Sequence, residues 1–149
     1  MHKVILVPVD TDDLSTARDA LALAVMMVEP EGRIHLVHVR SDLPKTWSEF
    51  LPPDFDAPQT KACEAALNNL ASEANFPRER ISTAVHIGGV YAQVLKEAEH
   101  VKADLIIAGS HQPSVVRDLW RSLLGVNAET IVSHATCSVM VLRTQKSSA

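Results

Sequence analysis

Short apolar runs, bounded by turn residues and separated by helical patterns, constrain the fold of this 149-residue chain more than any other feature. The runs are KVILVPV at residues 3–9, IHLVHV at 34–39, LIIA at 105–108, SVMVL at 138–142 and a weaker one, ISTAVHI, at 81–87. Nearly continuous runs rich in Val and Ile are typical of strands that are buried on both faces. The chain is therefore expected to form a sheet covered by helices on both sides.

Helical patterns fill most of the intervals between these runs. The helices are expected at residues 17–28, 58–74, 90–101 and 127–134. A carboxylate or hydroxyl of Asp12, Asp13 or Ser15 can cap the first helix, and the segment Glu29-Pro30-Glu31-Gly32 is expected to end it. The proline-containing residues 40–56 read as a long irregular loop.

Five strands alternating with four helices predict an open α/β sandwich. Parallel strands need crossover connections, and right-handed crossovers place helices on both faces of one sheet. Ligands of such sheets bind beyond the carboxyl ends of the strands, where the strand order reverses. The segments after the first, second and fourth strands are therefore the candidate binding loops.

Composition excludes several classes of function. The net charge is −4 and the basic residues are scattered, so the chain lacks the footprint of a nucleic-acid-binding protein. No apolar run approaches the roughly 20 residues that span a bilayer, and the first ten residues do not read as a signal peptide. We therefore expect no membrane association and a cytoplasmic location. Cys63 and Cys137 belong to no CxxC pair and are expected to be reduced thiols.

Catalytic and metal-binding motifs are not evident. His35 and His38 are three apart on a strand, so they face opposite sides and cannot chelate one metal together. His134 and Cys137 could suggest a thiol dyad, but a His near a helix C-terminus and a Cys at the start of a core strand have structural explanations. The sequence holds no GxSxG elbow, paired-carboxylate motif or Walker GK[ST]. We expect no catalytic residues, and at most a slow hydrolytic activity.

The stretch GSHQPSVVRDLWRSLLGVNAET, residues 109–130, follows a buried strand and resembles a phosphate cradle in outline. Two reasons could explain a glycine at position 109. It could let a ligand approach the backbone closely, or it could let the chain turn out of the strand. Gly125, Val126 and Asn127 open the last helix, where free N–H groups would point at an anion whatever the side chains are. The same three residues could equally be an ordinary helix start.

Polar side chains near the strand ends complete the candidate site. Ser110, His111 and Gln112 could donate to a phosphate or could belong to a solvated loop. Asp10 directly follows the first strand, where it could order a ligand or cap the first helix.

Four blocks of the chain carry a resemblance to a known family. They are VPVD, HLVHV, DLIIAGSH and LLGVNAETIVSHATCSVMVLR, which together cover nearly the full length. The chain resembles the universal stress protein family, and its SH-x-P and LLG-x-NA features resemble a bacterial subgroup with this loop variant. The resemblance implies one domain over residues 1–149. It implies an open parallel five-stranded sheet of order 3-2-1-4-5 with helices on both faces, like that of the adenine nucleotide alpha-hydrolases.

The resemblance also implies a ligand and a set of binding residues. Nucleotide-binding members hold ATP phosphates with a G-x2-G-x9-G-[ST] motif and contact adenosine from the first two strand ends. The matching residues in this chain are Pro8, Val9, Asp10, Val39, Ala108, Gly109, Ser110, His111, Gln112, Gly125, Val126 and Asn127. ATP, ADP or AMP is thus the expected ligand, with Mg²⁺ as a candidate ion on the phosphates. The family likeness further implies a homodimer through the C-terminal strand.

This chain departs from the glycine motif at three points. Gln112 stands in place of the second glycine, twelve residues instead of nine separate it from Gly125, and Val126 replaces the hydroxyl residue. The departures concern the phosphate site more than the adenosine site. Three interpretations stay open. The chain could be a protein that binds adenine nucleotides, a nucleotide-free dimer whose altered loop no longer holds phosphates, or an enzyme of a related α/β fold, such as an electron-transfer or nucleotidyl-transfer module.

Overall fold

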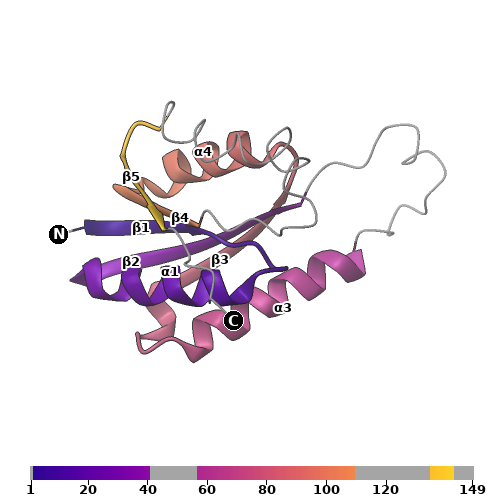
Figure 1. Ribbon diagram of the computed structural model, residues 1–149, viewed down its shortest axis with the longest axis horizontal. Helices are drawn as coiled ribbons and strands as arrows, with labels where there is room; N and C mark the ends of the chain where they lie inside the picture. Colours follow the sequence, from indigo (N-terminus) through magenta and orange to yellow (C-terminus); the bar gives the residue numbers. More distant parts are fainter. Residues whose placement is uncertain (1, 41–56, 110–134, 143–149) are drawn as a thin grey trace, which may run out of the picture.

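The computed structural model describes residues 2–40, 57–109 and 135–142 (Figure 1). In chain order, the elements are β1 (His2–Pro8), α1 (Leu14–Met27), β2 (Val28–Arg40), α3 (Ala57–Glu73), the short 3-10 helix η1 (Arg78–Arg80), β3 (Ile81–Ile87), α4 (Val90–Val101), β4 (Leu105–Gly109) and β5 (Ser138–Leu142).

The five strands form one sheet of order β3-β2-β1-β4-β5, and every neighbouring pair is parallel. The expected open parallel sheet and its strand order are therefore confirmed. β1 lies at the centre, and the chain first builds the sheet toward β3 and then returns to add β4 and β5 on the other side. The strand order consequently reverses between β1 and β4, which is where an open α/β sheet presents its ligand site.

Helices cover both faces of the sheet, as Figure 1 shows, with α1 and α3 on one side and α4 on the other. Alternate residues of β1 divide between the two cores: Ile5 and Val7 pack with α1 and α3, whereas Leu6 packs with Val94 of α4. Ile5, Leu6 and Val7 are all completely buried. This two-sided burial explains why the run at residues 3–9 is apolar without alternation.

The segment at residues 29–32 differs from its prediction. α1 ends at Met27 and β2 already begins at Val28, so Pro30 and Gly32 lie inside a strand rather than in a loop. The register between His2↔Val28 and Val4↔Arg33 is irregular, because β2 uses more residues than β1 over this stretch. A side chain at Gly32 would come within 2.5 Å of the Val28 side chain, so glycine permits this close bulge.

The other boundaries agree more closely. The strands at 81–87 and 138–142 and the helix at 90–101 are confirmed residue for residue. α1 begins three residues earlier than expected, and α3 is shifted by one residue from the expected 58–74. The loop at 41–56, the expected helix at 127–134 and the C-terminal tail lie outside the described residues.

Candidate functional site

The carboxyl ends of β1, β2 and β4 meet at one edge of the sheet, which we call the carboxyl rim. Backbone pairing of β1 with β4 covers only Ile5 and Leu6. Pairing of β1 with β2 continues to Pro8, and the Val9 amide then donates to the Val37 carbonyl at 2.7 Å. β1 therefore stays with β2 at its end while its hydrogen bonding to β4 stops earlier, at the point where the strand order reverses.

A tight acidic turn joins β1 to α1. Oδ1 of Asp10 accepts the Asp12 amide at 2.9 Å, and the Asp10 carbonyl accepts the Asp13 amide at 3.0 Å. Asp13 is the N-cap of α1, because its carboxylate accepts from the Thr16 amide and, at 2.6 Å, from the Thr16 hydroxyl. Asp13 thus fulfils the capping prediction, and the alternative that Asp10 caps the helix is wrong. The Asp10 carboxylate instead orders the turn at the carboxyl rim.

Burial sets the electrostatics of Asp10. The side chain is half-buried, and desolvation raises the pKa of its carboxyl above the ordinary value, opposed by the hydrogen bond from the Asp12 amide. The neighbouring charges of Asp12 and Asp13 act in the same direction as burial, and His38 acts against it. Because burial disfavours the ionised carboxylate, a hydrogen-bond donor or cation that a ligand places beside Asp10 would stabilise it.

Gly109 lies close to α1. A Cβ at this position would come within 2.5 Å of the Thr16 Cγ2 methyl, a separation that real side chains do not adopt. Thr16 is buried, and its hydroxyl is already fixed by the Asp13 cap. Close packing on α1 is therefore a structural reason for glycine here, in addition to the two that the sequence suggested. Through Thr16, the turn after β1 and the end of β4 are in contact.

The remaining described candidates lie at the same rim. Pro8 is half-buried and Ala108 is buried at the end of β4. Val9 belongs to the core on the α1 side, whereas Val39 packs against the core on the α4 side. The Val9 and Val39 side chains thus face opposite sides of the sheet. One ligand that reaches both residues would contact at least one of them through its backbone.

Half of the expected site lies outside the described residues. These candidates are Ser110, His111, Gln112, Gly125, Val126 and Asn127. Their contribution stays a prediction from the sequence.

Two residues at the rim were missed by the sequence interpretation. Thr16 was not singled out, although its place in the first turn of a helix is a common one for a hydroxyl that bonds the cap. Nδ1 of His38 lies 2.7 Å from the Val9 carbonyl and so ties the ends of β1 and β2 together. His38 and His35 do face opposite sides of the sheet, as their spacing predicted, because His35 is directed toward α4.

The thiols do not form a reactive centre within the described chain. Cys63 and Cys137 are free and half-buried. Burial raises the pKa of the Cys137 thiol above its ordinary value, which disfavours the reactive thiolate. His134, the other half of the dyad considered above, is outside the described residues.

Among the residues that are described, no helix has both the length and the apolar character that a membrane span requires.

Comparison with known proteins identifies the family. Residues 1–143 match the model of the universal stress protein family. The chain belongs to this family. It is 30% identical over 146 residues to universal stress protein G of Salmonella typhimurium, an alignment that covers 96% of this chain and 100% of the relative.

Solved structures share the fold of this universal stress protein domain. The structure of hypothetical protein MJ0577 has a TM-score of 0.77 at 23% identity and covers 99% of both chains. A universal stress protein in complex with cAMP has a TM-score of 0.63 at 15% identity, covering 97% of this chain and 98% of its own. A family member from Arabidopsis thaliana with AMP bound has a TM-score of 0.63 at 15% identity, covering 98% and 94%. At these identities the likeness establishes the fold alone.

Proposed function

We propose that the carboxyl rim binds an adenine nucleotide, and that the protein acts in stress response or signalling as a binding protein with little or no catalysis. The observation that carries the proposal is the end of β1, whose pairing with β4 stops at Leu6 while the strand continues to Pro8. The half-buried Asp10 lies two residues beyond that end. Support comes from two structures of the same fold, one with cAMP and one with AMP. ATP is the ligand we favour, with ADP and AMP as the alternatives.

The chemistry of the turn after β1 favours the nucleoside half of the ligand. Asp10, Asp12 and Asp13 place three carboxylates within four residues, and ionised carboxylates only accept hydrogen bonds. They would repel phosphate oxygens, and the Asp13 cap already occupies the first turn of α1. Ribose hydroxyls and the adenine amino group are donors and suit such acceptors. We therefore assign the adenosine end to Pro8, Val9, Asp10 and the backbone of Val39.

The phosphates then belong at the other side of the rim. Ala108 and Gly109 end β4 there, and the chain continues into Ser110, His111 and Gln112, which carry donors. The backbone amides of Gly125, Val126 and Asn127 are the proposed anchor, because a helix start offers free N–H groups to an anion. Val126 lacks the hydroxyl of the family motif, and one neutral hydrogen bond contributes only about 0.5–1.5 kcal/mol. Mg²⁺ on the phosphates is part of the same proposal.

Calorimetric titration with ATP, ADP, AMP and adenosine tests this division. If the proposal holds, adenosine binds and each phosphate adds affinity. Substituting Gly125 by a bulky residue should weaken ATP more than adenosine, whereas Asp10→Ala should weaken both. Equal losses for ATP and adenosine in the Gly125 variant would refute the phosphate role. Release of inorganic phosphate from ATP should be slow or undetectable, because the sequence carries no catalytic motif that would activate water.

A nucleotide-free dimeric protein is the second candidate. The contact between Gly109 and Thr16 favours this candidate, because packing on α1 explains the glycine without a ligand. Mass spectrometry of gently purified protein separates the two candidates, because a bound adenylate would be released on denaturation. Absence of a bound adenylate together with no heat in the titrations would favour the nucleotide-free protein.

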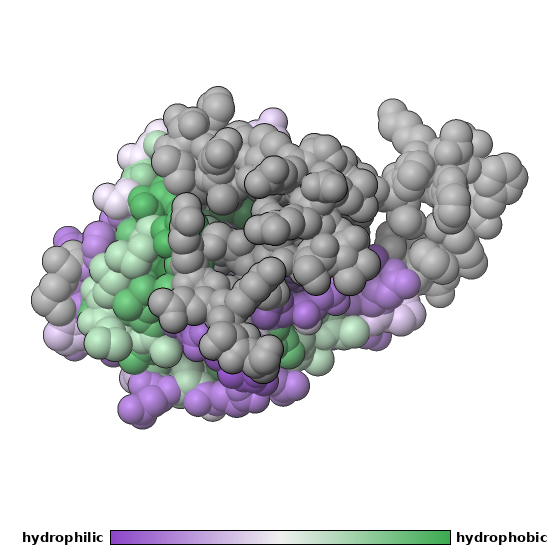
Figure 2. All heavy atoms as spheres, viewed as in Figure 1, coloured by the Kyte–Doolittle hydropathy of each residue, from purple (hydrophilic) through white to green (hydrophobic). Residues whose placement is uncertain are grey.

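We further propose a cytoplasmic homodimer that pairs through β5. β5 is the last strand of the sheet and pairs with β4 alone within the described chain. Val141 is 37% exposed on it, and Figure 2 shows hydrophobic residues gathered on the side of the molecule where β5 lies. An exposed apolar edge strand invites pairing with another copy. Sedimentation of the wild type and of Val141→Lys tests the dimer, since a charge on the edge should favour the monomer.

A further inference from the structure

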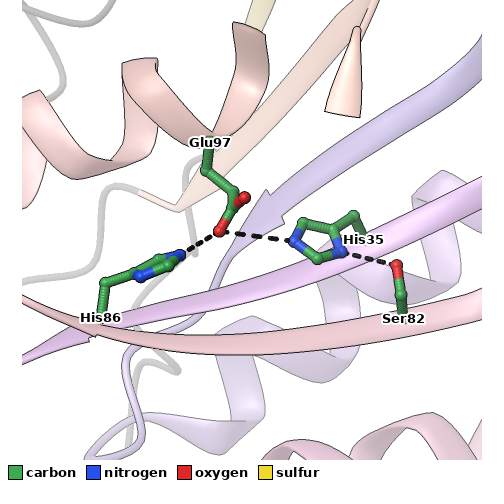
Figure 3. Close-up of polar contacts among 4 residues, drawn as sticks. All are labelled: His35, Ser82, His86 and Glu97. Atoms are coloured by element: carbon green, nitrogen blue, oxygen red, sulfur yellow. Dashed lines mark hydrogen bonds and ion pairs between the residues drawn. The ribbon is translucent and has the colours of Figure 1, made fainter. Parts of the chain in front are cut away.

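A buried polar cluster lies between α4 and the sheet, beside the carboxyl rim, since His86 pairs with Val39 across the sheet. It consists of Glu97 on α4, His35 on β2 and His86 and Ser82 on β3 (Figure 3). Oε2 of Glu97 forms a hydrogen bond with Nε2 of His86. The same oxygen lies 3.7 Å from Nε2 of His35, whose Nδ1 is 2.6 Å from the Ser82 hydroxyl. One carboxylate oxygen is thus placed between two imidazoles.

The cluster is closed on one side and open on the other. Glu97 and His35 are both 6% exposed, whereas the side chain of His86 is 39% exposed. His35 pairs across the sheet with Leu6 and Ser82, which carry no charge. Nε2 of His35 is buried without a hydrogen-bond partner in the structure. The geometry therefore leaves one buried nitrogen near a carboxylate that is already bonded to another imidazole.

In the part of the chain that the structure describes, the charged groups that act on His35 come from α4 and β3. They are Glu97, His86 and His100, which is the exposed last-turn histidine of α4. Within the described ranges, no group of three or more His, Cys, Asp and Glu side chains is arranged to hold a metal ion. Proton exchange, rather than metal binding, is the chemistry open to this cluster.

We propose that Glu97, His86 and His35 form a proton-operated latch, which holds α4 on the sheet near neutral pH and loosens it when His35 takes up a proton. A buried carboxylate needs a charged or hydrogen-bonding partner, and His86 supplies it from the sheet. A single proton held between Glu97 and His86 leaves the cluster without net charge. A second proton on His35 gives it a net positive charge in a buried site, which Glu97 alone cannot balance.

The direction of the response follows from burial. Desolvation lowers the pKa of His35 below its ordinary value, and His86 and His100 act in the same sense, whereas Glu97 opposes them. The unfolded chain therefore binds this proton more readily than the folded chain does. The stability that neutral His35 contributes is fully present above the ordinary imidazole pKa of about 6.5. It is lost as the pH falls from there through the lower pKa that His35 has in the folded chain.

Hydrogen exchange of the full chain, read by mass spectrometry, tests the latch. Protection of α4 amides is compared with that of α1 amides in the same sample, so that the intrinsic pH dependence of exchange cancels. The ratio of α4 to α1 protection should fall between about pH 7 and about pH 5.5, the range in which imidazoles titrate. It should fall by up to about tenfold for each pKa unit that separates unfolded from folded His35. An unchanged ratio in the wild type would overturn the proposal.

Two variants separate the latch from a general acid effect. His35→Asn keeps a group that can bond the Ser82 hydroxyl but removes the nitrogen that faces Glu97, so the ratio should become independent of pH. The matched control is His38→Asn, the same change three residues along β2 on the opposite face, which should keep the wild-type response. If His35→Asn responds like the wild type, His35 is not the proton acceptor and the proposal fails.

Imidazole NMR of the wild-type chain gives a test that does not depend on a variant folding. The ring nitrogens of His35 should titrate below the ordinary imidazole pKa of about 6.5, and the His86 ring signals should change in the same step because both rings face one oxygen. His35 signals that titrate at or above that value, or His86 signals that do not change when His35 titrates, would overturn the proposal.

Discussion

Replacing Gly109 by alanine gives the sharpest test of how the carboxyl rim is built. The new Cβ would lie 2.5 Å from Cγ2 of Thr16, so either β4 or α1 must move. Backbone strain plays no part, because the positive φ angles among the described glycines are confined to Gly88. Overpacking of this kind costs about 1–3 kcal/mol.

The Thr16 methyl group can be removed without disturbing the Asp13 N-cap of α1. Thr16→Ser deletes Cγ2 and keeps the hydroxyl that donates to Asp13 at 2.6 Å. The double variant Gly109→Ala with Thr16→Ser should therefore recover most of the loss. A double-mutant cycle from urea denaturation measures this coupling, which we expect to be about 1–2 kcal/mol in favour of the double variant. Additive effects would refute the packing account of Gly109.

The same double variant separates two reasons for glycine at this position. If Gly109 is needed only for packing on α1, the refolded double variant should bind AMP as well as the wild type. If a ligand approaches the Gly109 backbone, stability recovers but affinity does not. Titration of all four proteins of the cycle with AMP distinguishes these outcomes.

Three further predictions follow from the turn after β1 and from the start of α4. Asp13→Ala removes the N-cap of α1 and should lower the free energy of unfolding by about 0.5–2 kcal/mol, while the exposed control Asp12→Ala should change it little. Asp10→Asn keeps an oxygen for the Asp12 amide and removes a carboxylate whose pKa burial raises. Ionisation of Asp10 destabilises the native state, so the variant should have a larger free energy of unfolding than the wild type at neutral pH. This difference should disappear as the pH falls to the ordinary Asp pKa of about 3.9, and a difference that is constant across pH would contradict the prediction. Gly88 has φ of +144° and a Cβ there would lie 3.0 Å from the Gln93 side chain, so Gly88→Ala should cost about 1–3 kcal/mol. Gly89→Ala is its matched control, since a Cβ there meets nothing closer than 4.0 Å, and equal losses at both positions in denaturant titrations would count against the strain.

The parts of the fold that the sequence predicted well are those with local signals. The strand at residues 81–87 and the helix at 90–101 were placed correctly because Gly88 and Gly89 separate a β-branched run from a clear helical pattern. The sheet order is a long-range property, and it came from the family resemblance rather than from periodicity.

The errors arose where tertiary packing decides the outcome. Pro30 and Gly32 are strong loop signals, yet β2 passes through them because the start of β1 lies alongside and Gly32 leaves room for the Lys3 carbonyl. On α3, Ala62 and Ala65 are exposed, whereas Leu67 and Leu70 are buried. Alanine is a good helix former on either face, so it does not report burial.

The candidate site was predictable only as a set of strand ends. The rule for parallel sheets placed Asp10 and Gly109 at the rim, and the family resemblance added Pro8; all three lie there. The contact of Gly109 with Thr16 joins residues 93 positions apart, and no local pattern encodes it. For the latch one signal did exist: Glu97 occupies a position on α4 beside the buried Ala98 and one turn from Val94, where an apolar residue is normal.

The most direct test of nucleotide binding at the carboxyl rim is a two-dimensional ¹H–¹⁵N NMR titration of the full chain with AMP. The account predicts that the amides of Val9, Asp10, Val39 and Gly109 shift together with one dissociation constant, while amides in the middle of α3 do not move. No shifts up to millimolar AMP, or shifts confined to residues away from these strand ends, would contradict it.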